Sequence, residues 1–183
     1  MKNYIEDFNY YRARLRGILY NLLPGIKIGR RTLIEPGAQL RCQYGGTITI
    51  GDNCIICKGA ILQTHGGNIV LRNHCTINPY AVIYGQGGVE IFDGVRIAAQ
   101  VVIVPSNHIF SDPNTFIYMQ GLSKKGIKIE EDVWLGSGVK VLDGVKISKG
   151  CVIGANSVVT KSTDPMGVYA GIPAKKIKSR TSE

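Results

Sequence analysis

Aliphatic residues recur every six positions near the C-terminal end of this chain. They are Leu135, Val141, Ile147, Ile153 and Val159. An α-helix repeats about every 3.6 residues and a half-buried strand about every 2, so neither period fits. A period of six therefore restricts the fold more than any other feature of the sequence.

The six-residue count extends through most of the chain in groups of three. Eighteen positions carry Ile, Leu or Val, namely Ile28, Ile34, Leu40, Ile50, Ile56, Leu62, Leu71, Ile77, Ile83, Ile91, Ile97, Ile103, Ile129, Leu135, Val141, Ile147, Ile153 and Val159. Four places further on, outside the hexads that precede a break, small or β-branched residues stand at Thr32, Ala38, Cys54, Ala60, Cys75, Ala81, Val95, Val101, Val133, Val139, Val145, Cys151, Ser157 and Thr163. Two coincident patterns indicate a structural repeat rather than chance.

The repeat predicts a triangular prism. Each hexad supplies one short strand and a tight turn, three hexads make one coil, and coils stack through parallel-strand hydrogen bonds about 4.8 Å apart. The aliphatic residues fill the axis, the small residues lie at the corners, and glycines such as Gly29, Gly51, Gly136 and Gly154 follow the aliphatic position, where we expect a tight turn. The expected fold is all-β, a parallel β-helix of about six coils and about 30 Å in length.

A helix is expected at one end of the prism, because an open end exposes unpaired strand edges. Residues 4–22 place apolar side chains on one helical face, at Ile5, Phe8, Leu15, Ile18, Leu19 and Leu22. The same segment is basic and rich in tyrosine, so a helix lying on a membrane is the alternative. We favour the cap, and expect an N-terminal helical cap at 1–25, the β-helix at 26–164 and a basic C-terminal segment at 165–183.

One insertion in the repeat is much longer than the others. Ile103 and Ile129 are twenty-six residues apart instead of six, and three smaller insertions also follow the third hexad of a coil. All four therefore protrude at the same corner. A long loop in a compact repeat protein is usually functional, so we expect the catalytic groups on the protruding loop 104–128.

Composition excludes several classes of protein. No apolar run approaches the length of a membrane span, and the first twenty residues lack the features of a signal peptide. Five irregularly spaced cysteines argue against a disulfide framework and favour the cytoplasm. The net charge of +9 fits an anionic partner, with nucleic acid, a membrane surface and a phosphorylated cofactor as the candidates, and no nucleic-acid motif is present.

The cysteines and two histidines are weak candidates for a metal or redox site. Cys54 and Cys57 have CxxC spacing, but Cys54 occupies a small corner position, as do two other cysteines, and no second pair exists. His65 and His74 bracket a corner insertion, but residues 109–128, which follow the loop histidine, contain no further histidine. We therefore expect no metal and no covalent cysteine chemistry.

The coils, the loop that opens with "NH", and the stretches "VWLGSGVKVLDGV", "VIGANSVVTK" and "YAGIPAKKIK" resemble the hexapeptide-repeat acyltransferases. The resemblance covers about residues 26–178, and the nearest branch contains the maltose and galactoside O-acetyltransferases and the sugar acetyltransferases of surface-polysaccharide pathways. It implies a left-handed β-helix, an exception to the usual right-handed crossover. It also implies a homotrimer with active sites between subunits.

His108, at the start of the loop, is the candidate catalytic base. Imidazole is suited to accept a proton from a hydroxyl at neutral pH. The resemblance implies two substrate-binding residues, Asn78, whose amide faces outward after a core aliphatic, and Gln120, which orients the acceptor or His108. A turn-forming role for Asn78 is the alternative.

The resemblance also implies contacts with acetyl-CoA as co-substrate. The matching positions are Trp134, Ser137, Ala155, Thr160, Lys161, Lys175 and Lys178. The two final lysines stand where the family has arginine, so they offer charge without a bidentate fork. Packing at a subunit interface is the alternative for Trp134.

These observations predict a cytoplasmic enzyme that transfers acetyl from acetyl-CoA to a sugar hydroxyl. N-acetylation of a nucleotide-linked amino sugar is the alternative reaction, and a non-catalytic β-helix scaffold is the alternative of another class. The expected partners are a coenzyme A thioester, a sugar acceptor and further copies of the chain. We expect no nucleic-acid partner and no membrane association.

Overall fold

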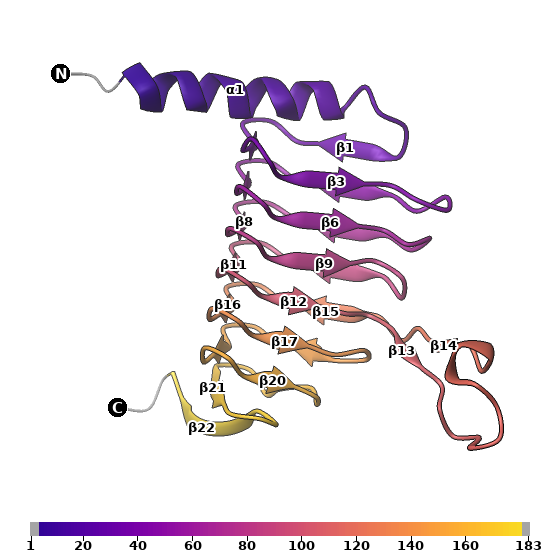
Figure 1. Ribbon diagram of the computed structural model, residues 1–183. Helices are drawn as coiled ribbons and strands as arrows, with labels where there is room; N and C mark the ends of the chain where they lie inside the picture. The colour runs from indigo at the N-terminus through magenta and orange to yellow at the C-terminus, as the bar shows by residue number, and fades with distance from the viewer. Residues whose placement is uncertain (1–3, 181–183) are drawn as a thin grey trace.

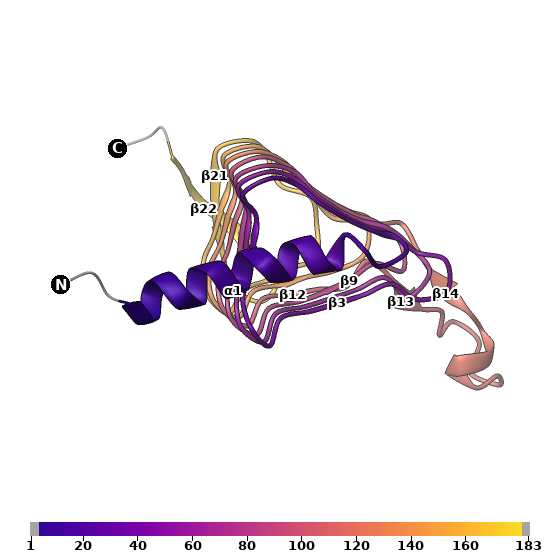
Figure 2. The same cartoon turned by 90° about the horizontal axis from the view of Figure 1, so that it is seen from above.

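A triangular stack of short strands carries one helix across its end and one projecting loop. The computed structural model describes residues 4–180, with side chains from residue 9 onward (Figures 1 and 2). The helix α1 (Tyr4–Tyr20) lies across the N-terminal end of the stack. The view from above in Figure 2 looks down the axis of the prism and shows its three faces.

Three parallel sheets form the faces. Face 1 contains β1 (Ile26–Ile28), β4 (Ile48–Ile50), β7 (Ile69–Leu71), β10 (Val89–Ile91), β15 (Ile127–Ile129) and β18 (Lys146–Ile147). Face 2 contains β2 (Leu33–Ile34), β5 (Ile55–Ile56), β8 (Thr76–Ile77), β11 (Arg96–Ile97), β16 (Trp134–Leu135), β19 (Val152–Ile153), β21 (Gly167–Ala170) and the antiparallel β22 (Lys175–Ser179). Face 3 contains β3 (Gln39–Arg41), β6 (Ile61–Gln63), β9 (Val82–Tyr84), β12 (Val102–Ile103), β17 (Lys140–Val141) and β20 (Val158–Val159). The predicted parallel β-helix is confirmed.

The predicted hexad positions form the core. Seventeen of the eighteen aliphatic residues are buried, and Ile28 in the first coil is half-buried. On face 2 they pair in register from coil to coil, as in Ile77 with Ile97 and Ile97 with Leu135. All fourteen small residues are buried as well. The chain therefore fills the axis of the prism with one continuous column of aliphatic side chains.

Several small corner residues between faces 1 and 2 also donate hydrogen bonds. Thr32 Oγ1 donates to the carbonyl of Gly51 at 2.7 Å, and Cys54 Sγ donates in the same way to the carbonyl of Arg72 at 3.0 Å. Cys75 repeats the contact one coil further on, with the carbonyl of Phe92. Threonine and cysteine at this corner are thus small enough to pack and polar enough to satisfy a carbonyl of the next coil.

Glycine is required after the aliphatic positions, but for a different reason from the tight turn that was predicted. None of the four has a positive φ; that conformation falls two residues later, at Arg31 with φ 57° and Asn53 with φ 56°. A Cβ on Gly29 would overlap the backbone of Gly51, and one on Gly51 would lie 2.8 Å from the carbonyl carbon of Arg72. Glycine is needed because the next coil approaches closely.

The helix α1 covers the end of the prism with the face opposite to the predicted one. Ala13 and Gly17 are buried against the first coil, where a Cβ on Gly17 would lie 3.2 Å from the carbonyl oxygen of Thr32. Arg16 Nη2 and Tyr20 Oη both donate to the carbonyl of Ala38.

The apolar residues assigned to the buried face point outward instead. Leu15, Ile18, Leu19 and Leu22 are 52–77% exposed, and Ile5 and Phe8 lie outside the residues whose side chains are described. The close approach of helix and coil explains the difference, because only small side chains fit between them.

Candidate active site

The long insertion forms a hairpin that projects from the corner between faces 3 and 1. Its strands β13 (Asn107–His108) and β14 (Leu122–Ser123) pair antiparallel, and the short helix η1 (Ile117–Met119) lies near its tip (Figures 1 and 2). His108 pairs with Leu122 and is exposed. The candidate base therefore stands on a strand held by a neighbouring strand, with its side chain open to a partner or substrate.

Polar contacts anchor both feet of the hairpin to the prism. Ser106 Oγ donates to Gln86 Oε1 at 2.9 Å, and Ser123 Oγ donates to Asp143 Oδ2 at 2.8 Å. The other carboxylate oxygen of Asp143 accepts from the backbone N–H groups of Lys125 and Gly126. These bonds fix the direction in which the loop leaves the corner.

Gln120 holds the tip of the loop together. Its Nε2 donates to the carbonyls of Asp112 and Thr115, and its Oε1 accepts from the N–H of Asp112. Asp112 Oδ2 in turn accepts from Thr115 Oγ1, and this hydrogen bond lowers the pKa of the Asp112 carboxyl. The amide of Gln120 is thus used inside the loop.

The outer part of the loop exposes apolar side chains. Phe116 and Tyr118 stack with ring centroids 6.0 Å apart and are 72% and 76% exposed. Phe110, Ile117 and Met119 are more than half exposed as well. Such a patch on an ordered arm marks a contact surface.

Asn78 lies at a different corner from His108. It follows β8 at the corner between faces 2 and 3, where its Nδ2 donates to the carbonyl of Ile97 in the next coil at 2.8 Å. Its Oδ1 is the atom left for an acceptor. The topology of a single chain therefore does not bring Asn78 and His108 together.

The predicted cofactor residues also divide between two corners. Trp134 stands on the outer side of face 2, 54% exposed, between Arg96 and Val152 on the neighbouring strands. Six of the ten predicted site residues share face 2 and the corner that ends it, and they are Asn78, Trp134, Ser137, Ala155, Lys175 and Lys178. His108, Gln120, Thr160 and Lys161 belong to the corner between faces 3 and 1. The predicted site residues thus form two groups separated by face 3, which we call the two half-sites.

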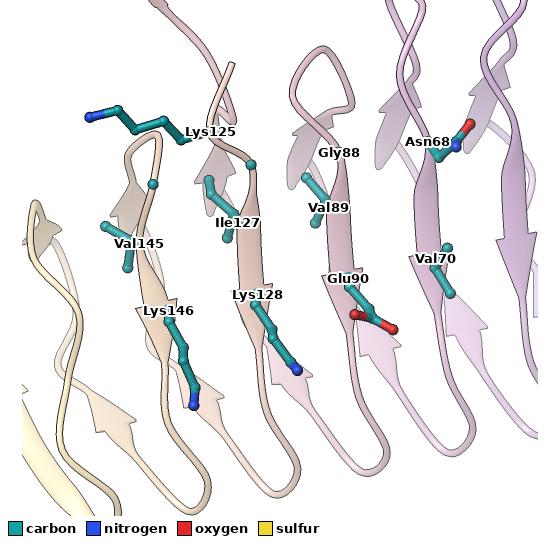
Figure 3. A pocket seen from close by; sticks show the side chains of 12 residues that line it. Asn68, Val70, Gly88, Val89, Glu90, Lys125, Ile127, Lys128, Val145 and Lys146 are labelled. Atoms are coloured by element: carbon teal, nitrogen blue, oxygen red, sulfur yellow. The ribbon is translucent and has the colours of Figure 1, made fainter. Parts of the chain in front are cut away.

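A basic hollow on face 1 was missed by the sequence reasoning. It has a volume of about 470 Å³ and lies beside the foot of the loop, from which Lys125 reaches it. Figure 3 shows the side chains of Glu90, Lys128 and Lys146 on three neighbouring strands of its floor. The signal that could have predicted this hollow is lysine at the outward position just before a core aliphatic residue, as at Lys128 and Lys146.

The cysteines and histidines form no metal cluster within residues 4–180. All five cysteines are free thiols, and burial raises the pKa of Cys57 to about 11. Cys54 is fully buried at the corner, and its thiol is used in a hydrogen bond to the backbone carbonyl of Arg72.

Known proteins match this chain over most of its length. Residues 126–161 match the family described as bacterial transferase hexapeptide (six repeats). The chain is 36% identical over 146 residues to a putative lipopolysaccharide biosynthesis O-acetyl transferase, WbbJ of Escherichia coli, covering 75% of this chain and 74% of that protein. It is 31% identical over 165 residues to the galactoside O-acetyltransferase of Lactococcus lactis, covering 80% and 70%.

The fold matches solved structures as well. One is the N-acyltransferase AntD from Bacillus cereus in complex with dTDP and 3-hydroxybutyryl-CoA, with a TM-score of 0.77 and 25% sequence identity. That match covers 91% of this chain and 88% of AntD. With the repeat, the anchored loop and these relatives together, the chain belongs to the hexapeptide-repeat acyltransferase family.

Proposed function

We propose that this protein transfers an acetyl group from acetyl-CoA to a hydroxyl of a sugar or saccharide. The observation that carries the proposal is His108, an exposed imidazole on a hairpin whose two feet are anchored to the prism. The relatives named as O-acetyltransferases support acetyl as the group and a saccharide hydroxyl as the acceptor. Surface-polysaccharide or sugar metabolism in the cytoplasm fits an enzyme of this kind.

His108 acts as the general base. Its neutral imidazole takes the proton of the acceptor hydroxyl while that oxygen attacks the thioester carbonyl. The C–S bond then breaks, and the imidazolium returns its proton to the coenzyme A thiolate. No covalent enzyme intermediate is needed, which agrees with cysteines that are used inside the prism.

The two half-sites are completed by a second copy of the chain. The loop corner of one subunit lies against the face-2 corner of its neighbour, so that His108 meets Asn78 and the cofactor residues across the interface. A heterologous contact of this kind closes into a ring, and a homotrimer suits a triangular prism. The exposed Phe116 and Tyr118 of the loop supply apolar surface for that contact.

Coenzyme A lies along face 2 in this arrangement. Trp134, Ser137 and Ala155 line the pantetheine arm of coenzyme A. Thr160 and Lys161 contribute from the corner between faces 3 and 1. Lys175 and Lys178 on β22 attract the phosphates as point charges rather than as bidentate forks. Asn78 Oδ1 accepts from an acceptor hydroxyl, and Gln120 keeps the loop in the shape that presents His108.

A second candidate reaction is N-acylation of an amino sugar on a nucleotide carrier. It is favoured by the similarity to AntD, an N-acyltransferase solved with dTDP and an acyl-CoA. An amine that is already neutral needs less help from a base, so removing His108 costs less in this reaction.

The proposal is tested by release of coenzyme A thiol from acetyl-CoA against a panel of mono-, di- and nucleotide sugars and their amino analogues. We expect turnover with a hydroxyl acceptor and a higher thermal unfolding midpoint with coenzyme A, since a ligand at 100 times its Kd stabilises by about 2.7 kcal/mol. A chain that neither binds coenzyme A nor releases its thiol contradicts the proposal. Turnover with amino sugars alone favours the second reaction.

A further inference from the structure

The outer side of α1 carries an apolar surface that the prism does not use. Tyr11, Leu15 and Ile18 on the helix, and Leu22 in the turn that follows it, are spaced by three or four residues and are 55–77% exposed. We call these four residues the outer row. Within the described part of the helix they lie opposite Ala13 and Gly17, which face the first coil. The apolar row therefore points away from the prism, beyond its end.

The contacts of α1 with the prism fix this orientation. Asn21 Nδ2 donates to the carbonyl of Ile28, and the N–H of Ile28 donates to Asn21 Oδ1. With the bonds from Arg16 and Tyr20 to the carbonyl of Ala38, polar contacts at three positions hold the helix. A rotation that buried the outer row would break all of them and drive large side chains against the backbone of Thr32.

A basic pocket adjoins the outer row. It has a volume of about 440 Å³ and is lined by Arg14 and Ile18 from the helix and by Arg30 and Arg31 from the first coil. Asp52 pairs with Arg30, with Nη2 and Oδ2 3.3 Å apart, so the excess positive charge of the pocket rests on Arg14 and Arg31. Guanidinium groups around a hollow of this size suit the oxygens of a phosphate.

Apolar and basic groups side by side on one end are the pattern of a surface that lies on a membrane. No helix within residues 4–180 has the length and apolar character needed to cross a bilayer, so the contact is interfacial. The helix α1 lies across the end of the prism, whereas the loop that carries β13 and β14 projects from its side (Figure 1). A contact at this end therefore leaves the loop and face 2 accessible.

We propose that the α1 end of the prism docks on an anionic lipid surface, in contrast to the expectation from the sequence of no membrane association, because the apolar face of the helix is exposed rather than packed on the prism. The outer row enters the boundary between head groups and acyl chains, and the pocket of Arg14, Arg30 and Arg31 takes a lipid phosphate. Tyr11 suits the boundary because its ring is apolar and its hydroxyl remains wet. The inference does not depend on the proposed reaction, since none of these residues belongs to the candidate active site.

Flotation of the purified full chain with vesicles tests the proposal. We expect binding to phosphatidylcholine vesicles that contain phosphatidylglycerol, little binding to phosphatidylcholine alone, and weaker binding as salt is added. The double variant Arg14→Gln with Arg31→Asn should bind about 25-fold more weakly, since each arginine near the surface contributes a factor of about five. Asparagine suits position 31 because Asn53 has the same φ one coil later. Ile18→Ser with Leu22→Ser should lose binding at least about tenfold.

Matched controls change the other end of the molecule. Lys149→Gln with Lys176→Gln removes the same charge, and Ile177→Ser removes an apolar side chain that is 63% exposed on β22. Both should bind vesicles as the parent does. Equal weakening by the lysine control would assign binding to net charge alone and overturn the proposal.

Two further outcomes also overturn it. One is a parent chain that does not float with the anionic vesicles. The other is self-association, measured by sedimentation, that Ile18→Ser with Leu22→Ser abolishes, because the outer row then binds a second copy. Coenzyme A release measured in solution separates the two proposals: normal release without flotation refutes only the membrane contact, and flotation without release refutes only the reaction.

Discussion

The prism and the His108 loop place apolar side chains in opposite environments, one buried and one exposed. In the prism, apolar side chains such as Ile97 and Leu135 have no exposed surface, because successive coils of the same chain cover them. In the loop, Phe116 and Tyr118 are largely exposed although the loop is ordered by its own hydrogen bonds. The prism buries its apolar residues within one chain, whereas the loop leaves Phe116 and Tyr118 exposed in that chain.

The difference also separates stability from function. A stack of buried coils gains its free energy from burial, whereas the loop is held by a few polar contacts at its feet and tip. These polar contacts fix the direction of the loop and leave its apolar side chains exposed. Changes in the prism should therefore unfold the protein, and changes in the loop should alter activity or association.

The largest expected effect is a loss of turnover without a loss of stability. His108→Ala should lower turnover about 10²–10⁴-fold, since it removes the general base, with an unchanged thermal unfolding midpoint because the side chain is exposed. Thiol release and thermal unfolding measure the two quantities. His74→Asn is the control, an exposed histidine at another corner whose φ of 59° asparagine tolerates. Near-parental turnover of the alanine variant would remove His108 from the mechanism.

The second prediction compares the two regions directly. Leu135→Ala should lower the free energy of unfolding by about 2–5 kcal/mol, because it opens a cavity in a fully buried column. Tyr118→Ala, which removes a larger side chain from the loop, should change it by less than about 0.5 kcal/mol at a protein concentration too low for association. Denaturant unfolding measures both. Comparable losses would mean that the loop contributes to the core of the fold.

The smallest effect lies within the loop itself. Gln120→Ala removes three hydrogen bonds, two of them exposed to water and one part-buried, at a local cost of about 1 kcal/mol. Amide hydrogen exchange should accelerate in residues 107–123 and not in the strands of face 2, and turnover should fall severalfold. Asn114→Ala, whose side chain is not part of this network, serves as the control. Unchanged exchange and kinetic constants would leave Gln120 without a positioning role.

The fold could be predicted from the sequence to a large extent, because a period of six leaves few alternatives. Positions such as Ile56 and Ile153 are buried where the count puts them, and the long insertion leaves the expected corner. The orientation of α1 could not be predicted in this way. Helical periodicity identifies an apolar face, but only the backbone of Thr32 beneath Gly17 shows that small side chains must face the prism.

The sequence names candidate site residues one by one but does not show how they are arranged. Counting hexads in threes assigns Asn78 and His108 to different corners, yet the period says nothing about how two chains meet. The lysines of face 1 illustrate a second limit. Lys128 and Lys146 are far apart in sequence from Glu90, and only the pairing of β10, β15 and β18 gathers them at one hollow.

The reversal of the chain at β22 has a consequence for the length of the molecule. A stack of parallel coils can be extended by a further coil, because the last coil exposes strand edges that are free to pair. Here β22 runs antiparallel along β21, and Arg180 ties the segment back to Asp132 and to the carbonyl of Gly150. A further parallel coil from another molecule would therefore meet a strand of the wrong direction on face 2, which disfavours end-to-end stacking along that face.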